Sequence, residues 1–335
     1  MKTDLYPLLL RPQFHPRVWG AQNLAPVYDV EFSEPVGEAW LTGEQCQVLN
    51  GSLAGHTLAE LVRDYGTELI GSGYDSSRFP LLIKLLFPHD KLSVQVHPDD
   101  EGARRKGQPC GKTECWYVWK AEPGAKIGLG LRSGISKAEL KRAIKEKRME
   151  TLLNWIEARR GDMFYVDAGT VHAIGPGLIL VETQQNSDAT YRLYDYGRTR
   201  ELHIEDGLAA VKEQTHAGKV PARMPRMDAG NIQRNLLTAP CFIVDQLRFV
   251  RRSRFERESP AKAKVLCLIA IEGAGQIEFG QMAPIKVCTG HAVIVPAAVQ
   301  QFWLRPESEL ELLCAWAPES SATINENRQK SPFVP

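Results

Sequence analysis

Apolar and polar residues alternate with a period of two along much of this chain, which is the pattern of half-buried β-strands. The clearest example is the segment 93–97, Ser-Val-Gln-Val-His. Residues two apart in a strand share a face, so Gln95 and His97 point one way while Val94 and Val96 point into packing. The segment predicts a strand with one chemically active face.

A second strand is predicted from Lys112 into the apolar run 115–119, and by the same rule Lys112 and Glu114 share a face. If this strand lies next to the one that carries Gln95 and His97, the two offer an amide, an imidazole and a carboxylate. These are three of the four ligands that a divalent metal ion needs, and Lys112 adds a possible proton carrier. A single His beside a proline and two aspartates, such as His97, is more often a surface residue than a metal ligand. A fourth ligand elsewhere in the chain is therefore needed to support a metal site.

Helical periodicity is confined to short segments between the strands. Thr57 and Glu60 form a capping-box pattern that predicts a short helix from residue 57. Similar signals predict helices over about 136–148 and 149–157, so we expect a small helical insertion at about 133–157. A further helix is expected at 203–214, followed by a linker at 216–230.

Short strands fill nearly all of the chain from residue 231 onward. A chain of many short strands with helical insertions indicates an all-β core built as a barrel or jelly roll, because closure removes exposed sheet edges. We therefore expect two domains, residues 1–230 with the candidate site and the helices, and residues 231–335.

Composition and charge limit the possible functions. The 335 residues are 43% apolar and 24% charged with a formal net charge of +1, which is ordinary for a globular protein and gives no basic footprint for nucleic acid. Proline or charge interrupts the apolar runs, which are too short to cross a bilayer. The start of the chain has no signal-peptide pattern, and its seven cysteines include no C-x-x-C pair. We expect a cytoplasmic protein without nucleic-acid or membrane partners.

An internal repeat supplies the missing ligand. The spacing of Gly, turn residues and a final polar residue in 161–172 recurs in 290–301, and both resemble the second motif of the cupin superfamily, G-x5-P-x-G-x2-H. The first copy ends at His172 but has Asp167 at the proline position, whereas the second copy ends at Gln301. We therefore expect the first copy to hold a metal ion and the second to lack a metal site.

The four candidate metal ligands are Gln95, His97, Glu114 and His172. Two imidazoles and a carboxylate favour Zn²⁺, although Fe²⁺, Mn²⁺ or Co²⁺ remain possible. Lys112 lies on the face of Glu114, and Arg192 follows the strand after His172. An Arg stays charged and stabilises a developing oxyanion.

Four segments of the sequence resemble type I phosphomannose isomerases in their shorter bacterial form. They are PLLIKLLFPHDKLSVQVHPDD, GKTECWY, GDMFYVDAGTVHA and ETQQNSDATYRLYDYGR. Gly37-Glu38-Ala39-Trp40 also matches the E-x-W segment of that family. The resemblance covers about residues 5–215 and is weak beyond 230.

The resemblance implies a fold of two cupin-like jelly-roll barrels with a helical part, and one zinc ion per chain. It places the metal ligands at Gln95, His97, Glu114 and His172. It also places the catalytic arginine at Arg192 and the motif lysine, with a catalytic and substrate-binding role, at Lys112. Lys84 matches another lysine of the family's site and is expected, with Arg192, to bind substrate.

The implied function is the interconversion of mannose 6-phosphate and fructose 6-phosphate through a cis-enediol. Two other functions remain open, a sugar-phosphate-binding cupin without catalysis and an Fe²⁺-dependent cupin dioxygenase. The dioxygenases usually carry a His-x-His pair, where this chain has Gln95-x-His97. We expect a monomer or a weak homo-oligomer; the catalytic base and the phosphate-binding residues are not identified by the sequence.

Overall fold

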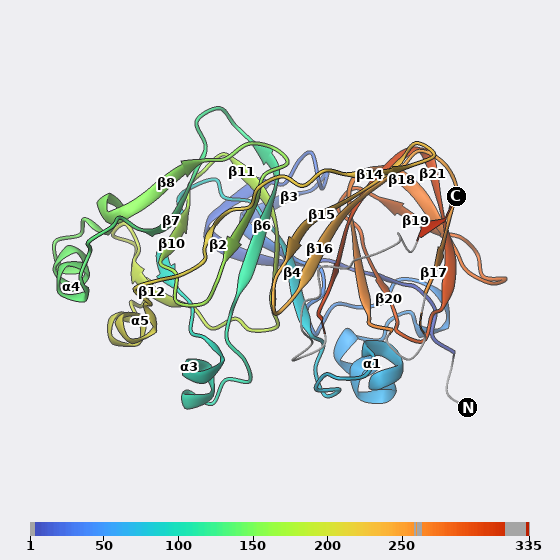
Figure 1. Cartoon of the computed structure of the whole chain (residues 1–335), viewed down its shortest axis with the longest axis horizontal. Coiled ribbons are helices and arrows are strands. Elements are labelled where there is room, and N and C mark those ends of the chain that lie inside the picture. Colours follow the sequence, from blue (N-terminus) through green and yellow to red (C-terminus); the bar gives the residue numbers. More distant parts are fainter. Residues whose placement is uncertain (1–3, 258, 260–262, 319–332, 335) are drawn as a thin grey trace.

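β-strands in three antiparallel sheets dominate the architecture. The computed structural model describes residues 4–257, 259, 263–318 and 333–334. Within these residues the sheets contain seven, five and ten strands. Figure 1 shows them as two β lobes side by side, with the helices at the periphery. This arrangement confirms the predicted mainly β fold of two cupin-like jelly-roll barrels with a small helical insertion.

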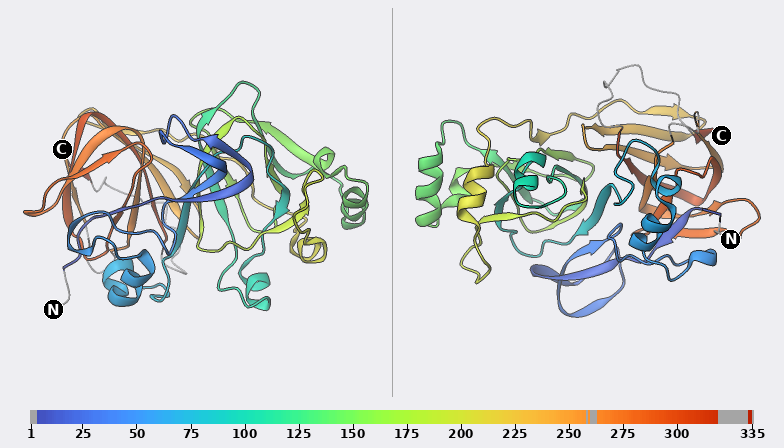
Figure 2. Two further views of the ribbon diagram at one scale, coloured as in Figure 1. Left: turned by 180° about the vertical axis from the view of Figure 1, so that it is seen from behind. Right: turned by 90° about the horizontal axis from the view of Figure 1, so that it is seen from below.

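The first barrel consists of the seven-stranded and five-stranded sheets, whose inner faces share one apolar cluster. The seven-stranded sheet contains β2 (Gln13–Asn23), β3 (Glu31–Trp40), β4 (Leu81–Leu86), β6 (Glu114–Ala121), β9 (Met163–Val166), β11 (Leu178–Gln185) and β13 (Gly218–Lys219). The five-stranded sheet contains β5 (Val94–Val96), β7 (Lys126–Leu131), β8 (Leu153–Glu157), β10 (His172–Ile174) and β12 (Tyr191–Tyr194). Seen from below, β2 and β3 form a blue hairpin that extends beyond the barrel (Figure 2).

The second barrel is the ten-stranded sheet. It contains β1 (Leu8–Leu10), β14 (Arg226–Asp228), β15 (Asn231–Thr238), β16 (Ile243–Phe249), β17 (Ser253–Glu256), β18 (Leu266–Glu278), β19 (Ile285–Cys288), β20 (Ala292–Val295), β21 (Gln301–Trp316) and β22 (Phe333–Val334). Although β1 and β14 precede residue 231, β1 pairs with β20 and β14 pairs with β15. The division of the chain into 1–230 and 231–335 stays a prediction.

Short helices lie at the periphery of the barrels (Figure 1). They are α1 (Leu58–Tyr65), α2 (Thr67–Ile70), α3 (Asp100–Arg105), α4 (Lys137–Lys145) and α5 (Ile204–Ala210), with 3₁₀ turns at Gly51–Leu53 and Met149–Leu152. The predicted capping box is present, since Thr57 accepts a hydrogen bond from the Glu60 amide and the Glu60 carboxylate accepts one from the Thr57 amide. Figure 1 shows α4 and α5 at the end of the first barrel that is remote from the second.

Three segments differ from the sequence-based prediction. The predicted helix at 149–157 is a 3₁₀ turn followed by β8, because residues 153–157 pair with β7 and complete the five-stranded sheet. The helix predicted over 203–214 ends at Ala210, where Val211 becomes extended and the Lys212 amide donates to the Gly169 carbonyl. The predicted linker 216–230 contains β13 and β14, each paired with a different sheet.

The two copies of the repeat start with the same backbone turn. Gly161 and Gly290 have φ values of +87° and +86°, a region that side chains with a Cβ rarely adopt. β9 follows the first glycine and β20 the second. The later turn differs, since Gly169 has φ +94° whereas Ala298 is not among the described residues with positive φ. The repeat found in the sequence is therefore also present in the structure. The two copies differ in the turn that precedes His172 and Gln301.

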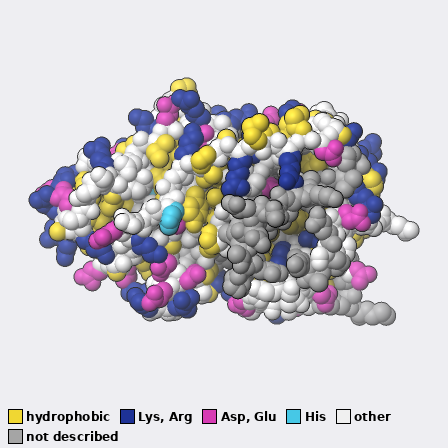
Figure 3. All heavy atoms as spheres, in the orientation of Figure 1, with side chains coloured by type: hydrophobic (Ala, Val, Ile, Leu, Met, Phe, Trp, Pro, Cys, Tyr) yellow, Lys and Arg dark blue, Asp and Glu magenta, His cyan; other side chains and the backbone are white. Residues whose placement is uncertain are grey.

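No helix among the described residues has the length and apolar character needed to cross a membrane. On the face shown in Figure 3, Lys and Arg side chains are interspersed with Asp and Glu side chains. The charges on this face are mixed rather than segregated.

Candidate metal centre and active-site cavity

The strands that carry the predicted metal ligands lie in the two facing sheets of the first barrel. Gln95 lies on β5 and His172 begins β10 in the five-stranded sheet, whereas Glu114 begins β6 in the seven-stranded sheet. The strands of Gln95 and Glu114 are not neighbours within one sheet, because β5 pairs with β10 and β12. The alternation within each strand is correct, and it directs His97 and Glu114 toward each other across the space between the sheets.

Four side chains converge at this point. His172 lies directly opposite Gln95 in the β10–β5 pair, so both project from the same face, and their Nε2 atoms are 3.1 Å apart. Glu114 Oε2 lies 3.4 Å from His97 Nε2, and Glu114 Oε1 lies 3.4 Å from His172 Nε2. Ligand atoms about 2.1 Å from a tetrahedral zinc ion are about 3.4 Å from one another. Both Glu114–His separations match this value, and all three buried donors lie within 4.8 Å of one another, so the three could hold one metal ion.

The protonation of the two imidazoles also suits metal binding. His97 Nδ1 lies 2.9 Å from the Ala189 carbonyl and His172 Nδ1 lies 3.0 Å from the Thr170 carbonyl, so each Nδ1 donates and each Nε2 lone pair faces Glu114. Burial lowers the pKa of His172 to about 3 and, together with the charge of Lys112, lowers the pKa of His97. Both rings are neutral near pH 7, as ligands must be.

Both carboxylate oxygens of Glu114 are buried, and neither accepts a hydrogen bond from the described residues. Unpaired buried acceptors are costly unless a cation or donor satisfies them. The Lys112 ammonium lies 2.9 Å from Oε2. Burial by itself raises the pKa of Glu114, but the charge of Lys112 outweighs it, so the pKa falls well below its usual range. An ionised, under-coordinated carboxylate between two neutral imidazoles fits a divalent cation.

Gln95 completes the set through its amide. As placed, its Oε1 accepts a hydrogen bond from Ser93 Oγ at 3.1 Å, and its Nε2 faces His172. A rotation of the amide by 180° exchanges the two atoms and directs the oxygen to the same space. The amide is thus in position to serve as an oxygen ligand.

Lys112 is buried between Glu114 and His97, with its Nζ 3.2 Å from His97 Nε2. Burial lowers the pKa of Lys112, but the attraction of Glu114 outweighs it and the net shift is upward. A metal ion held at Glu114 would add a positive charge that disfavours the ammonium form of Lys112. In the protein alone, Lys112 is an ammonium ion that compensates Glu114.

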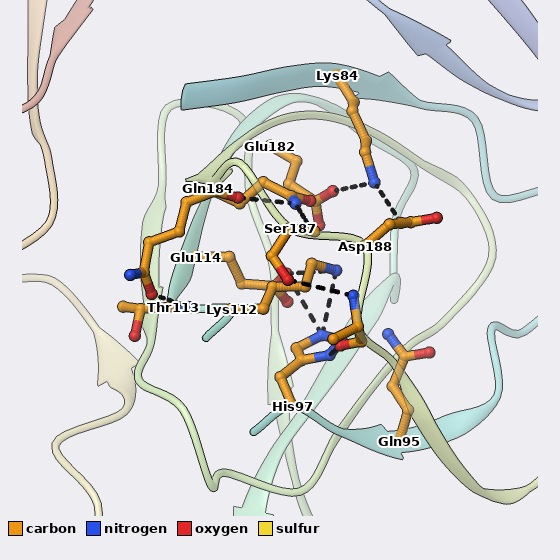
Figure 4. Close-up of polar contacts among 12 residues, drawn as sticks. Lys84, Gln95, His97, Lys112, Thr113, Glu114, Glu182, Gln184, Ser187 and Asp188 are labelled. Carbon is orange, nitrogen blue, oxygen red and sulfur yellow. Dashed lines mark hydrogen bonds and ion pairs between the residues drawn. The ribbon is translucent and has the colours of Figure 1, made fainter. Parts of the chain in front are cut away.

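Lys84 lies at the centre of a second charged cluster that the sequence did not indicate. Its buried ammonium is 3.8 Å from Glu38 Oε2, 3.5 Å from Glu182 Oε2 and 3.3 Å from Asp188 Oδ1. Figure 4 shows Lys84 reaching from β4 toward Glu182 and Asp188, on the side of the barrel opposite Gln95 and His97. These carboxylates raise the pKa of Lys84 above its usual value in spite of burial.

The two glutamates of this cluster have different pKa values. Burial would raise the pKa of Glu38, but Lys84 and Arg17 outweigh it and lower the pKa to about 2. Burial and then repulsion by Glu114 raise the pKa of Glu182 to about 7, although Trp116 Nε1 donates to its Oε1 at 3.0 Å. Glu182 is therefore the carboxyl group of the cluster that can gain or lose a proton near neutral pH.

Cross-strand register brings this cluster together. Trp40, Lys84, Glu182 and Trp116 lie directly opposite one another on β3, β4, β11 and β6, and so share the inner face of the sheet. A charged residue within an otherwise apolar strand is the sequence feature that could have indicated this cluster. Lys and Glu are almost never fully buried unless they are paired with another polar group. The sequence shows this signal at Lys84 and at Glu182, but not which residues pair.

A cavity of about 420 Å³ lies beside both clusters. Four of the predicted site residues line it, namely Lys84, Gln95, Lys112 and Arg192, while His97, Glu114 and His172 are not among its lining residues. Arg192 lies opposite Gln95 on β12 and donates from Nη1 to the Glu201 carbonyl at 2.8 Å. Burial and the nearby Arg200 charge lower the pKa of Arg192. The volume lies in the range of small-molecule sites.

Comparison with known proteins identifies relatives of this chain. Residues 8–117 match the family model for the catalytic domain of type I phosphomannose isomerase. The mannose-6-phosphate isomerase of Streptococcus mutans is 35% identical over 324 residues, which are 93% of this chain and 99% of that protein. Mannose-6-phosphate isomerase ManA of Bacillus subtilis is 34% identical over 315 residues, which are 90% of this chain and 97% of that protein.

Solved structures agree with the sequence comparison. The crystal structure of the mannose 6-phosphate isomerase from Bacillus subtilis matches with a TM-score of 0.81 and 32% identity, over 92% of this chain and 99% of that chain. A putative mannosephosphate isomerase from Archaeoglobus fulgidus shares the fold at 20% identity, with a TM-score of 0.72 over 95% of this chain and 99% of that chain. The similarity extends through the second barrel, where the sequence motifs are weak. The chain belongs to the type I phosphomannose isomerase family.

Proposed function

We propose that this protein interconverts mannose 6-phosphate and fructose 6-phosphate with one bound zinc ion. The main support for this proposal is that His97, Glu114 and His172 converge beside a cavity. The relatives of this chain are also named mannose-6-phosphate isomerases. We further propose residues 1–230 as the catalytic domain, since all four proposed ligands lie there, and residues 231–335 as a second domain without a metal site.

The proposed metal ligands are Gln95, His97, Glu114 and His172. Two neutral imidazoles and one carboxylate favour zinc among divalent ions, and the amide oxygen of Gln95 adds a harder ligand. When bound there, the ion would supply Lewis-acid polarisation and a template for substrate oxygens.

The reaction moves a proton between C2 and C1 of the open-chain sugar through a cis-enediol, and negative charge develops on O1 and O2. In our proposal Arg192 stabilises this charge, because its guanidinium lines the cavity and its Nε has no hydrogen-bond partner among the described residues. Lys112 and Lys84 bind substrate oxygens, and Lys112 takes part in proton transfer. Glu182, with a pKa of about 7, is our candidate for the base, since a base works best when its pKa lies near the operating pH.

A coupled assay for fructose 6-phosphate formed from mannose 6-phosphate tests the proposal, run with chelator and then with added zinc. We expect turnover that chelation removes and zinc restores. His172→Ala should lose bound metal and activity together, while His216→Ala, at a side chain that is 95% exposed, should keep both.

Two outcomes would contradict the proposal. Binding of mannose 6-phosphate without turnover by protein that holds one zinc ion per chain would favour a sugar-phosphate sensor. Bound iron with oxygen consumption would favour a cupin dioxygenase. The cytoplasmic location and the oligomeric state stay predictions.

A further inference from the structure

Three guanidinium groups line the cavity, from three separate positions in the chain. Arg17 lies in β2, Arg192 in β12, and Arg200 in the loop that follows β12. The side chains of Arg17 and Arg200 are 28% and 24% exposed, whereas those of Lys84 and Lys112 are 2% and 4% exposed. The arginines therefore lie at the solvent end of the cavity and the lysines at its inner end.

Arg17 reaches the cavity because the β2–β3 pairing is interrupted. Pro16 and Ala21 both pair with Val36, so residues 17–20 form a bulge that has no partner residues on β3. Arg17 Nε and Nη2 donate to the two carboxylate oxygens of Glu38 at 3.0 and 2.9 Å, and Nη1 donates to the Pro16 carbonyl. A guanidinium has five N–H groups, so two remain for a ligand.

Arg200 is held in the same way by a different carboxylate. Its Nε and Nη2 donate to the two oxygens of Asp195 at 2.8 and 2.6 Å, and the Asp195 side chain is 1% exposed. Three of the five N–H groups of Arg200 therefore remain for a ligand. A bidentate ion pair fixes the plane of a guanidinium. Arg17 and Arg200 are therefore both held in one orientation and keep N–H groups available to bind a ligand.

The charges at this end of the cavity favour an anion. Arg17 and Arg200 lie close enough to Arg192 for their charges to disfavour its positive form. Glu38 pairs with Arg17 and Asp195 pairs with Arg200, but Arg192 forms no ion pair among the described residues, and Glu182 and Asp188 both lie against Lys84. Five cationic and three acidic side chains line the cavity, so positive charge is in excess there. A dianion placed among the arginines would relieve their mutual repulsion and accept charge-assisted hydrogen bonds.

We propose that Arg17 and Arg200 bind the phosphate group of the substrate and so set the preference for phosphorylated over free hexose. This inference rests on the proposed function. The carbons that react, C1 and C2, must lie at the inner end near Lys112 and Gln95, and the phosphate on C6 is at the other end of the open-chain sugar. An extended substrate therefore directs its phosphate toward the solvent end, where the two arginines present their free donors.

The test uses the zinc-loaded protein and the variants Arg17→Gln and Arg200→Gln. Inorganic phosphate is titrated by calorimetry, and kcat and KM are measured for mannose 6-phosphate. Loss of one charge-assisted contact should raise the Kd of phosphate and the KM by roughly tenfold or more, with kcat within about threefold of the parent protein. Zinc content should not change. Arg248→Gln is the matched control, because Arg248 forms a bidentate pair with Glu309 in the second barrel, away from the cavity.

The outcomes separate this inference from the proposed function. If both variants bind phosphate as the parent protein does and keep its KM, or if kcat falls while KM is unchanged, the phosphate assignment is wrong. If the parent protein has no isomerase activity, titration of mannose 6-phosphate against mannose still decides the question. A preference for the phosphorylated sugar that both variants lose would support the assignment, and equal affinity for the two sugars would overturn it.

Discussion

Glu182 offers the sharpest test of the electrostatics of this site, through the substitution Glu182→Gln. The folded state raises the pKa of Glu182 from 4.5 to about 7, so the folded protein binds the proton more tightly than the unfolded chain does. The contribution of Glu182 to stability is therefore fully present below pH 4.5, falls as the pH rises from 4.5 to about 7, and is lost above that range. Glutamine keeps an oxygen to accept the Trp116 hydrogen bond but does not ionise.

The pKa shift gives the expected magnitude. Between pH 5 and pH 8 the wild-type protein should lose about 2–3 kcal/mol of unfolding free energy that Glu182→Gln does not lose. All other titrating groups are common to both proteins, so the difference between the two pH profiles reports Glu182 together with its electrostatic effect on Glu114 and the nearby lysines. Removing the negative charge also leaves Lys84 with two carboxylates instead of three, an effect that applies mainly at high pH.

Urea unfolding of the metal-free proteins, followed by tryptophan fluorescence at several pH values, measures this difference. Trp116 reports directly, because its indole donates to Glu182. Glu309→Gln serves as a control, since it removes a half-exposed carboxylate whose pKa is lowered by Arg248 rather than raised. If the stability difference between wild type and Glu182→Gln is the same at pH 5 and pH 8, Glu182 does not titrate near neutrality and its proposed role as base loses its support.

Three further predictions concern the metal site and the fold. Zinc at a hundredfold excess over its Kd should raise the unfolding free energy of the wild-type protein by about 2.7 kcal/mol, and calorimetry should show no such gain for Glu114→Gln. Thr57→Ala, which removes the cap of α1, should cost about 1 kcal/mol in urea unfolding, whereas Thr57→Ser should cost much less. Gly71→Ala should lower the unfolding free energy by more than about 1 kcal/mol, because Gly71 has φ +98° and a Cβ there would overlap the Ala263 carbonyl. Gly124→Ala, at positive φ but in open space, should cost less, and equal losses for the two glycines would contradict the steric argument.

The sequence by itself determined the local features of this protein. Period-two alternation predicted which side chains share a face, and in the structure Lys112 and Glu114 are in contact as that pattern predicts. The capping box at Thr57 and the glycine turns of the repeat were also readable, because they depend on interactions over a few residues. The spacing of the repeat predicted a ligand position at His172, which lies beside the other donors.

Only the tertiary structure decided which strands face one another. Strand pairing depends on closure of the barrel, so β5 and β6 lie in opposite sheets although they are close in sequence. Residues 153–157 become a strand because β7 offers a free edge, which overrides a local helical preference. Long-range packing also gathers Glu38, Glu182 and Asp188 around Lys84 and brings Arg17 to the cavity through a bulge in β2. Lys84 and Asp188, which are 104 positions apart in the sequence, become neighbours only when the sheets close, and no pattern within a strand records that closure.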